Sequence, residues 1–303
     1  MTQKAMIFVL GVGRSGSSAM TGVLSMCGAA LPGPLLGANE GNPKGHFEPA
    51  EALVLNDGFL AENDSAFHDP SLRVQKALAA DDVARERLIG RITELIETWP
   101  DSDLLVAKDP RITAVADCWF TAAHRKGFSV KAIVMLRHPR EVAASFAARD
   151  RLSMSLSTTL WLKYNFLAER LSSSLPRVFV EYSNLLGNWR AEIARISEAL
   201  SISLSLSREV EIDGFLSQEL YRQKSADWHF SEAQDPWTQA LYESLAQASR
   251  DALLDTRSLN RLYTQYVACA AMFQDSWVEF RDRFAPAPTL QVRKQVQVRR
   301  RRK

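Results

Sequence analysis

The sequence predicts an α/β protein with a P-loop-like parallel sheet flanked by helices, followed by a helical C-terminal region. Short apolar segments alternate with segments of helical periodicity in the first part of the 303 residues, which is typical of a parallel sheet covered on both faces. The first apolar segment runs directly into a glycine-rich turn. The pattern becomes helical only toward the C-terminus.

Each predicted strand is short, apolar and bounded by polar or turn residues. The strands are Ala5–Leu10, Asp103–Ala107, Lys131–Arg137 and Arg177–Glu181. The predicted helices among and after them are Gly16–Cys27, Asp81–Thr98, Thr113–Lys126, Pro139–Arg149, Ser155–Ser173 and Asn184–Leu200. Because parallel sheets bind ligands beyond the carboxyl ends of their strands, we expect the functional site at that edge.

Two regions lie outside this alternation. Leu31–Glu48 is rich in Gly, Pro and Asn without periodicity, which predicts a long loop of the kind that is often functional. From about Pro236, aromatic and leucine side chains recur at helical spacing, which predicts helices packed on the sheet. We expect one domain over residues 1–284, helical from about 206, and a basic tail over residues 285–303.

The net charge of +2 hides an uneven distribution. The last eleven residues carry seven positive charges, and the rest of the chain holds 30 basic and 35 acidic residues. The basic character therefore belongs to the tail, and we expect no nucleic-acid partner for the body. The last eleven residues lack large apolar side chains, so we expect a disordered, solvated end. Contact with anionic lipid or another polyanion is the alternative.

Hydropathy and cysteine spacing bear on location. No apolar run reaches the roughly 18 residues of a membrane helix, and the N-terminal run is too short for a signal peptide. Cys27, Cys118 and Cys269 are far apart and show no metal-binding spacing. We therefore expect a cytoplasmic protein with free thiols.

The turn Gly11–Ser18, GVGRSGSS, has the length of the phosphate-binding motif G-x-x-x-x-G-K-[ST], but Ser17 replaces the lysine. Glycines let backbone amides approach an anion, and a helix N-terminus beside them favours negative charge. Arg14 adds forked donors inside the turn. The pattern predicts an anion site at Gly13, Arg14, Ser15, Gly16, Ser17 and Ser18. A plain Gly/Ser turn with Arg14 on a surface carboxylate is the alternative.

A strand-end acid that might hold Mg²⁺ for ATP chemistry is Asp109, after the strand Asp103–Ala107. Lys108 beside it would place a positive charge next to the metal. A donor that needs no metal fits the sequence better, because a sulfuryl group carries less charge than a terminal phosphoryl group.

Here the chain resembles a known family. GVGRSGSS resembles the 5′-phosphosulfate loop of sulfotransferases that use 3′-phosphoadenosine 5′-phosphosulfate (PAPS), and its RSGSS form is similar to that of carbohydrate sulfotransferases. VMLRHPREVAASF resembles the family's 3′-phosphate element, R-x-P-x-x-x-x-x-S, which implies that Arg137 and Ser145 bind one phosphate that ATP lacks. Taken singly, Arg137 fits a surface ion pair and Ser145 a packed helix serine.

A third segment, AKDPR, resembles the KDP segment of tyrosylprotein sulfotransferases and implies that Lys108 contacts the leaving sulfate. Taken alone it fits a surface turn. VEYSNLL resembles a strand-and-helix segment of many sulfotransferases and bears on fold alone. The resemblance covers roughly residues 5–190 and implies transfer of a sulfuryl group from PAPS to a hydroxyl or amine, with Arg14 and Lys108 stabilising the leaving group.

The base that deprotonates the acceptor is sought in GNPKGHFEP, which contains His46 and Glu48. The resemblance does not decide between them. We favour Glu48. Its alternative role is structural, because a carboxylate before a helix over Ala50–Leu60 interacts favourably with the helix dipole. His46 is the reserve, with an ordinary pKa suited to the task, or else an exposed loop histidine.

Other residues have weaker support. Arg222 and Lys224 are considered for the 3′-phosphate, although the family's RKG motif is absent. Trp161 and Tyr164 fit the core or a groove wall better than a sugar-stacking platform. Trp228 and His229 invite the same idea with less support.

We therefore predict a PAPS-dependent sulfotransferase acting on a carbohydrate or another hydroxyl-bearing small molecule, with no metal expected. The KDP segment points instead toward protein tyrosine. The alternatives are a P-loop kinase or NTPase that uses ATP and Mg²⁺, and an inactive nucleotide-binding scaffold that finds partners through its basic tail.

Overall fold

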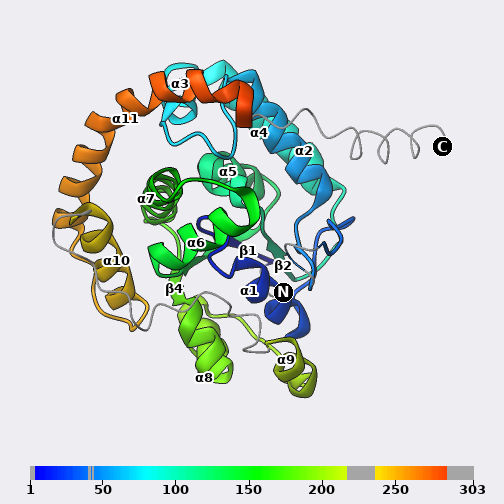
Figure 1. The fold of residues 1–303 in the computed structure, drawn as a ribbon. Helices are drawn as coiled ribbons and strands as arrows, with labels where there is room; N and C mark the ends of the chain where they lie inside the picture. The colour runs from blue at the N-terminus through cyan, green and yellow to red at the C-terminus, as the bar shows by residue number, and fades with distance from the viewer. Residues whose placement is uncertain (1–3, 40–41, 43, 217–235, 285–303) are drawn as a thin grey trace.

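The computed structural model describes residues 4–39, 42, 44–216 and 236–284. Its centre is one sheet of four parallel strands in the order β2-β1-β3-β4 (Figure 1). The strands are β1 (Ala5–Leu10), β2 (Leu104–Ala107), β3 (Ser129–Leu136) and β4 (Arg177–Glu181). The α/β prediction is confirmed, and every predicted strand is present within two residues of its bounds.

Helices connect and follow the strands. They are α1 (Ser17–Met26), α2 (Ala50–Glu62), α3 (Arg73–Ala80), α4 (Asp82–Glu97), the 3₁₀ helix η1 (Pro110–Val115), α5 (Ala116–Arg125), α6 (Pro139–Asp150), α7 (Met154–Leu171), α8 (Tyr182–Leu200), α9 (Glu209–Phe215), α10 (Pro236–Ala248) and α11 (Thr256–Phe284). The helix predicted over Thr113–Lys126 is wrong at its start. A proline at the first position of η1 and a cap from Asp109 begin a tighter helix there, and the α-helix starts at Ala116.

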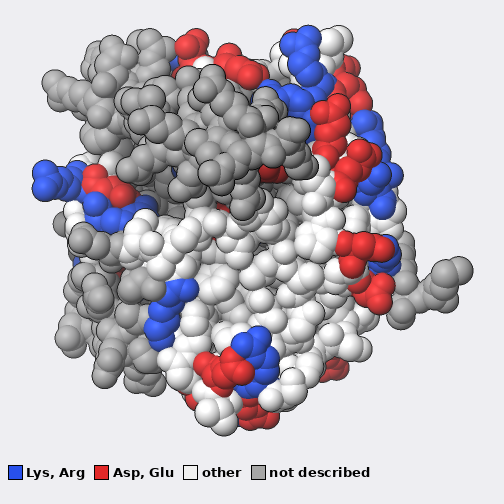
Figure 2. All heavy atoms as spheres, turned by 90° about the vertical axis from the view of Figure 1, so that its right-hand side faces the viewer, with Lys and Arg blue, Asp and Glu red and all other residues white. Residues whose placement is uncertain are grey.

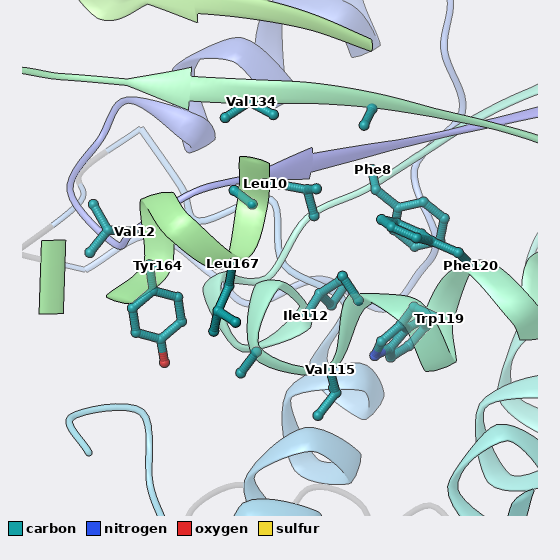
Figure 3. Close-up of a cluster of buried hydrophobic side chains, with 14 of the residues drawn as sticks. Phe8, Leu10, Val12, Ile112, Val115, Trp119, Phe120, Val134, Tyr164 and Leu167 are labelled. Atoms are coloured by element: carbon teal, nitrogen blue, oxygen red, sulfur yellow. The ribbon is translucent and has the colours of Figure 1, made fainter. Parts of the chain in front are cut away.

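The sheet is buried on both faces because side chains of each strand alternate between two apolar clusters. Phe8 and Leu10 of β1 point into the larger cluster, with side chains of η1, α5 and α7 (Figure 3). Ile7 and Val9 point into the second cluster, which α1 and α8 cover. The strands are therefore fixed from both sides, and so are the turns that leave their carboxyl ends.

The predicted helical C-terminal region is present as α10 and α11. Tyr242 of α10 donates a 2.6 Å hydrogen bond to Glu181 at the end of β4, and α11 follows the periphery of the molecule (Figure 1). The predicted division at residue 284 stays a prediction, since the tail over 285–303 lies outside the described residues.

The surface carries charges of both signs. On the face shown in Figure 2, basic and acidic side chains lie next to each other around an area formed by other residues. In the described part of the chain, no helix combines the length and apolarity needed to span a membrane. Cys27 and Cys118 are buried free thiols, and Cys269 is a partly exposed one.

Candidate active site

A cavity of about 830 Å³ lies at the carboxyl ends of the strands. The segments that follow all four strands contribute to its lining: Arg14 after β1, Lys108 after β2, Arg137 after β3 and Tyr182 after β4. Three of these four side chains are cationic, so the cavity suits an anionic ligand. The sheet edge predicted to bind ligand is therefore hollowed and basic.

The glycine-rich turn forms one wall of this cavity. Arg14 and Gly16 have φ of +71° and +91°, a left-handed conformation that lets the chain turn tightly before α1. A Cβ atom on Gly16 would lie 2.2 Å from the ring of Tyr182, so only glycine fits there. Ser17 and Ser18, which begin α1, line the cavity beside the unpaired amides of the helix N-terminus.

Gly13 and Ser15 differ in their exposure to the cavity. Gly13 lines it. Ser15 is fully buried, and its Oγ atom has no hydrogen-bond partner among the described residues. Its amide donates a 3.3 Å hydrogen bond to the Val12 carbonyl, so the predicted role of Ser15 in the anion site stays a prediction.

Arg14, Arg137 and Ser145 form one cluster. Arg14 Nε donates a 2.9 Å hydrogen bond to Ser145 Oγ, and Arg137 donates a 3.2 Å bond to the carbonyl oxygen of Arg14. Arg137 also pairs with the buried carboxylate of Glu141 at 2.8 Å. Burial, with Arg149 and Arg137 nearby, lowers the pKa of Arg14 to about 10, which still leaves it charged at neutral pH. The two elements predicted separately from sequence thus meet in space.

Lys108 lies in a second cluster. Its Nζ atom donates to Glu48 Oε1 at 2.6 Å, to Ser18 Oγ at 2.8 Å and to the His46 carbonyl oxygen at 3.2 Å. The Lys108 and Glu48 side chains are only 3% and 8% exposed. Glu48 is the buried counterion of Lys108, and within the described residues its side chain makes no capping hydrogen bond to α2.

His46 lines the cavity beside Glu48. Its Nε2 atom is buried and has no hydrogen-bond partner within the described residues. Burial lowers the pKa of His46, an effect that the Glu48 carboxylate opposes only in part. The ring is therefore neutral at pH 7 and able to accept a proton.

Asp109, the acidic residue that follows β2, is not among the residues that line the cavity. It is fully buried, and its carboxylate accepts 3.0 Å hydrogen bonds from Asn56 and from the amide and guanidinium of Arg111. Burial favours a lower pKa for Arg111, but Asp109 and Asp57 raise it above its usual value. Among the described residues, no group of three or more His, Cys, Asp or Glu side chains is arranged to hold a metal.

The weaker candidates have separate outcomes. Trp161 and Tyr164 are fully buried and donate to the carbonyls of Arg137 and Phe67, so they belong to the core, as the sequence favoured. Arg222, Lys224, Trp228 and His229 lie outside the described residues.

Among the residues that line the cavity without having been singled out for the site, five carry aromatic or cationic side chains close to the predicted residues. They are Phe67, His68, Arg111, Arg149 and Tyr182. Arg111 and Tyr182 stand in the quoted segments AKDPR and VEYSNLL, where their place directly after a strand pointed to the site edge. Phe67, His68 and Arg149 lie in none of the quoted segments, so no sequence signal pointed to them.

Comparison with known proteins gives matches at the level of structure alone. No protein family and no curated protein matches the sequence. The chain is similar to the sulfotransferase domain of the Synechococcus PCC 7002 olefin synthase (TM-score 0.47, 16% identity, 81% of this chain and 96% of that one). It is also similar to the sulfotransferase domain of the curacin biosynthetic pathway (TM-score 0.44, 18% identity, 81% and 99%).

Proposed function

We propose that this protein transfers a sulfuryl group from PAPS to the hydroxyl of a carbohydrate or another small molecule. One observation carries the proposal. The anion-binding turn, the Arg137–Ser145 element and Lys108 line a single cavity at the ends of the strands. The sequence resemblance gave these three elements three different roles toward one donor, and such roles require them to converge.

The residues present fit that donor. The turn offers backbone amides and a helix N-terminus where Gly16 leaves no room for a side chain. Arg137 and Ser145 are suited to the additional 3′-phosphate, and the hydrogen bonds of Arg14 with Ser145 and Arg137 tie this element to the turn, where Arg14 is placed toward the leaving group. When bound, the donor supplies the sulfuryl group and a phosphate leaving group.

Lys108 and Glu48 have complementary parts in the transfer. Lys108 holds a positive charge beside Ser18 at the start of α1, where it is placed to stabilise charge on the leaving oxygen. Glu48 is placed to accept the proton of the attacking hydroxyl, with neutral His46 as the alternative base. The 2.6 Å ion pair holds the cation and the base next to each other before any substrate arrives.

A kinase or NTPase that uses ATP and Mg²⁺ is the competing function. It requires an acidic side chain directed at the nucleotide, and Asp109 is instead committed to Asn56 and Arg111. It also gives no role to the Arg14–Ser145 contact. The arrangement therefore favours a donor that is bound without a metal.

Turnover tests the proposal directly. The protein is incubated with ³⁵S-labelled PAPS, EDTA and a panel of pyranosides and phenols, and labelled products are separated from donor. We expect labelled product from the wild type and at least a hundredfold less from Lys108→Met, as expected for losing a group that stabilises the leaving oxygen. Donor binding without transfer to any compound would favour the inactive scaffold. Label transfer that Lys108→Met leaves intact would remove the proposed role of Lys108.

A further inference from the structure

The segment between α2 and α3, residues 63–72, forms a wall of the cavity through Phe67 and His68. We call it the α2–α3 wall. The ring of Phe67 touches the anion-binding turn, since a Cβ atom on Gly13 would lie 2.9 Å from Phe67 Cζ. The Arg111 guanidinium lies 5.4 Å from the centroid of the same ring. The wall therefore stands directly beside the place where the sulfuryl group is transferred in the proposed function.

Two side chains of α7 hold this wall through its backbone. Tyr164 donates a 2.9 Å hydrogen bond to the Phe67 carbonyl, and Lys163 donates a 2.7 Å bond to the Asp69 carbonyl. The wall has no regular helix or strand, so its carbonyl groups need such partners once they are buried. The Asp69 carboxylate adds internal bonds to Ser65 Oγ (2.7 Å) and the Ser71 amide (2.8 Å).

Two side chains of α11 complete the support. Tyr266 donates a 2.6 Å bond to the Pro70 carbonyl across 196 residues of sequence. Trp277 donates a 3.1 Å bond from Nε1 to the Asp64 carbonyl across 213 residues. Both side chains are at most 2% exposed. In Figure 1, α11 runs along the edge of the molecule, and the segment that accepts these bonds ends where α3 begins.

We propose that Tyr266 and Trp277 are positioning residues for the α2–α3 wall, and that Phe67 and His68 on this wall receive the ring of the hydroxyl-bearing acceptor. The acceptor part rests on the proposed function. The C-terminal helix thereby acquires a role in acceptor binding, although it contributes neither residue to the cavity lining.

The chemistry of the wall fits a ring. Phe67 is held between Gly13, Phe146 and Tyr164, with ring centroids 6.2 and 5.2 Å from the last two. Phe67 is only 8% exposed, so the part of its ring that lines the cavity forms a fixed apolar edge, against which a pyranose or another aromatic ring can pack. Burial lowers the pKa of His68 to about 4, so its ring is neutral at pH 7 and can hydrogen-bond a hydroxyl without attracting anions.

Hydrogen exchange tests the positioning without any ligand. Backbone exchange of residues 63–72 is compared among wild type, Tyr266→Phe and Trp277→Phe, which keep a ring and lose the donor. Tyr263→Phe, in the same helix as Tyr266, is the matched control, because the Tyr263 ring packs on Phe166 of α7 (5.6 Å). We expect about three- to tenfold faster exchange in Tyr266→Phe and Trp277→Phe, as the loss of one hydrogen bond predicts. The control should exchange at the wild-type rate. Exchange in β1 should stay unchanged. If residues 63–72 exchange at the wild-type rate in both variants, the positioning role is overturned.

Kinetics test the acceptor part. For the pyranoside or phenol that the wild type sulfates fastest, we expect Tyr266→Phe and Trp277→Phe to raise the acceptor KM about three- to tenfold. Affinity for 3′-phosphoadenosine 5′-phosphate (PAP) should stay at the wild-type value. An unchanged acceptor KM would overturn the acceptor role. The same holds if the protein binds PAP but sulfates none of the ring-bearing compounds. If the wild type does not bind PAP, the proposed function fails, and the exchange result still decides the positioning role.

Discussion

Lys108 Nζ lies 2.6 Å from Glu48 Oε1, and both side chains are almost completely buried. The pair joins the end of β2 to the loop that leads into α2, across 60 positions of sequence. In a buried pair each charge depends on the other, because water cannot replace the missing partner. The contact therefore fixes the loop that carries Glu48 and also sets a cation beside a carboxylate in the cavity.

Breaking this pair from one side should be costly. We expect Lys108→Met to lower the free energy of unfolding by about 3–5 kcal/mol, since it leaves the Glu48 carboxylate buried and unpaired. The double variant Lys108→Met/Glu48→Gln should recover much of that loss. Urea denaturation of the three proteins measures both effects. The exposed pair of Arg125 with Glu86 is the control, and Arg125→Met should change stability little. A double variant no more stable than Lys108→Met would contradict this account.

The base can be identified by two conservative substitutions. Glu48→Gln keeps the shape of the side chain and removes its basicity, so we expect kcat to fall about 10²- to 10⁴-fold with PAP affinity nearly unchanged. His46→Asn should lower kcat far less. Initial rates with saturating PAPS, together with PAP titration, separate the two. The reverse order of effects would transfer the role of base to His46, whose Nε2 atom lacks a partner within the described residues.

The contact of Gly16 with Tyr182 predicts a paired result for two glycines. Gly16 and Gly28 have φ of +91° and +102°, so alanine at either position costs about 1 kcal/mol or more of backbone strain. At Gly16 the new Cβ atom would also lie 2.2 Å from the Tyr182 ring, whereas nothing lies within 4 Å at Gly28. We expect Gly16→Ala to lose a further 1–3 kcal/mol, approximately, and most PAP affinity. Denaturation and calorimetry would contradict this if the two variants behaved alike.

Lys163 gives the protein a predictable dependence on alkaline pH. Burial lowers the pKa of Lys163 to about 8, below the value of about 10.4 expected in the unfolded chain. The unfolded chain therefore binds this proton more tightly than the folded chain. The resulting loss of folding stability has its full size below about pH 8. As pH rises toward about 10.4, the contribution of Lys163 to stability should improve by up to about 3 kcal/mol.

A difference measurement isolates that contribution. The free energy of unfolding is measured from pH 7 to 10 for wild type and for Lys163→Met, which removes the titrating group. The difference should move in favour of the wild type as pH rises. A difference that stays constant with pH would show that Lys163 does not titrate as predicted.

Local patterns predicted the strands well because each ends in a clear break, as β1 does at Gly11. The quoted motifs also supplied Arg14, Lys108, Arg137 and Ser145, since each has a fixed spacing from the end of a strand, Ser145 through helix α6. The α2–α3 wall could not be predicted in this way. Phe67 and His68 acquire their place from Tyr266 and other distant donors, and nothing in their neighbouring sequence records that contact.

Calorimetric titration with PAP in the absence of metal, beside ATP with Mg²⁺, tests the central claim most directly. Arg137→Lys keeps a charge opposite Glu141 but removes the forked donor, and Arg125→Met is the control for a distant cation. We predict micromolar binding of PAP, weaker binding of ATP with Mg²⁺, and a loss of about tenfold or more in PAP affinity for Arg137→Lys alone. Tighter binding of ATP with Mg²⁺, or the same PAP affinity in Arg137→Lys, would contradict the sulfotransferase account and favour the kinase.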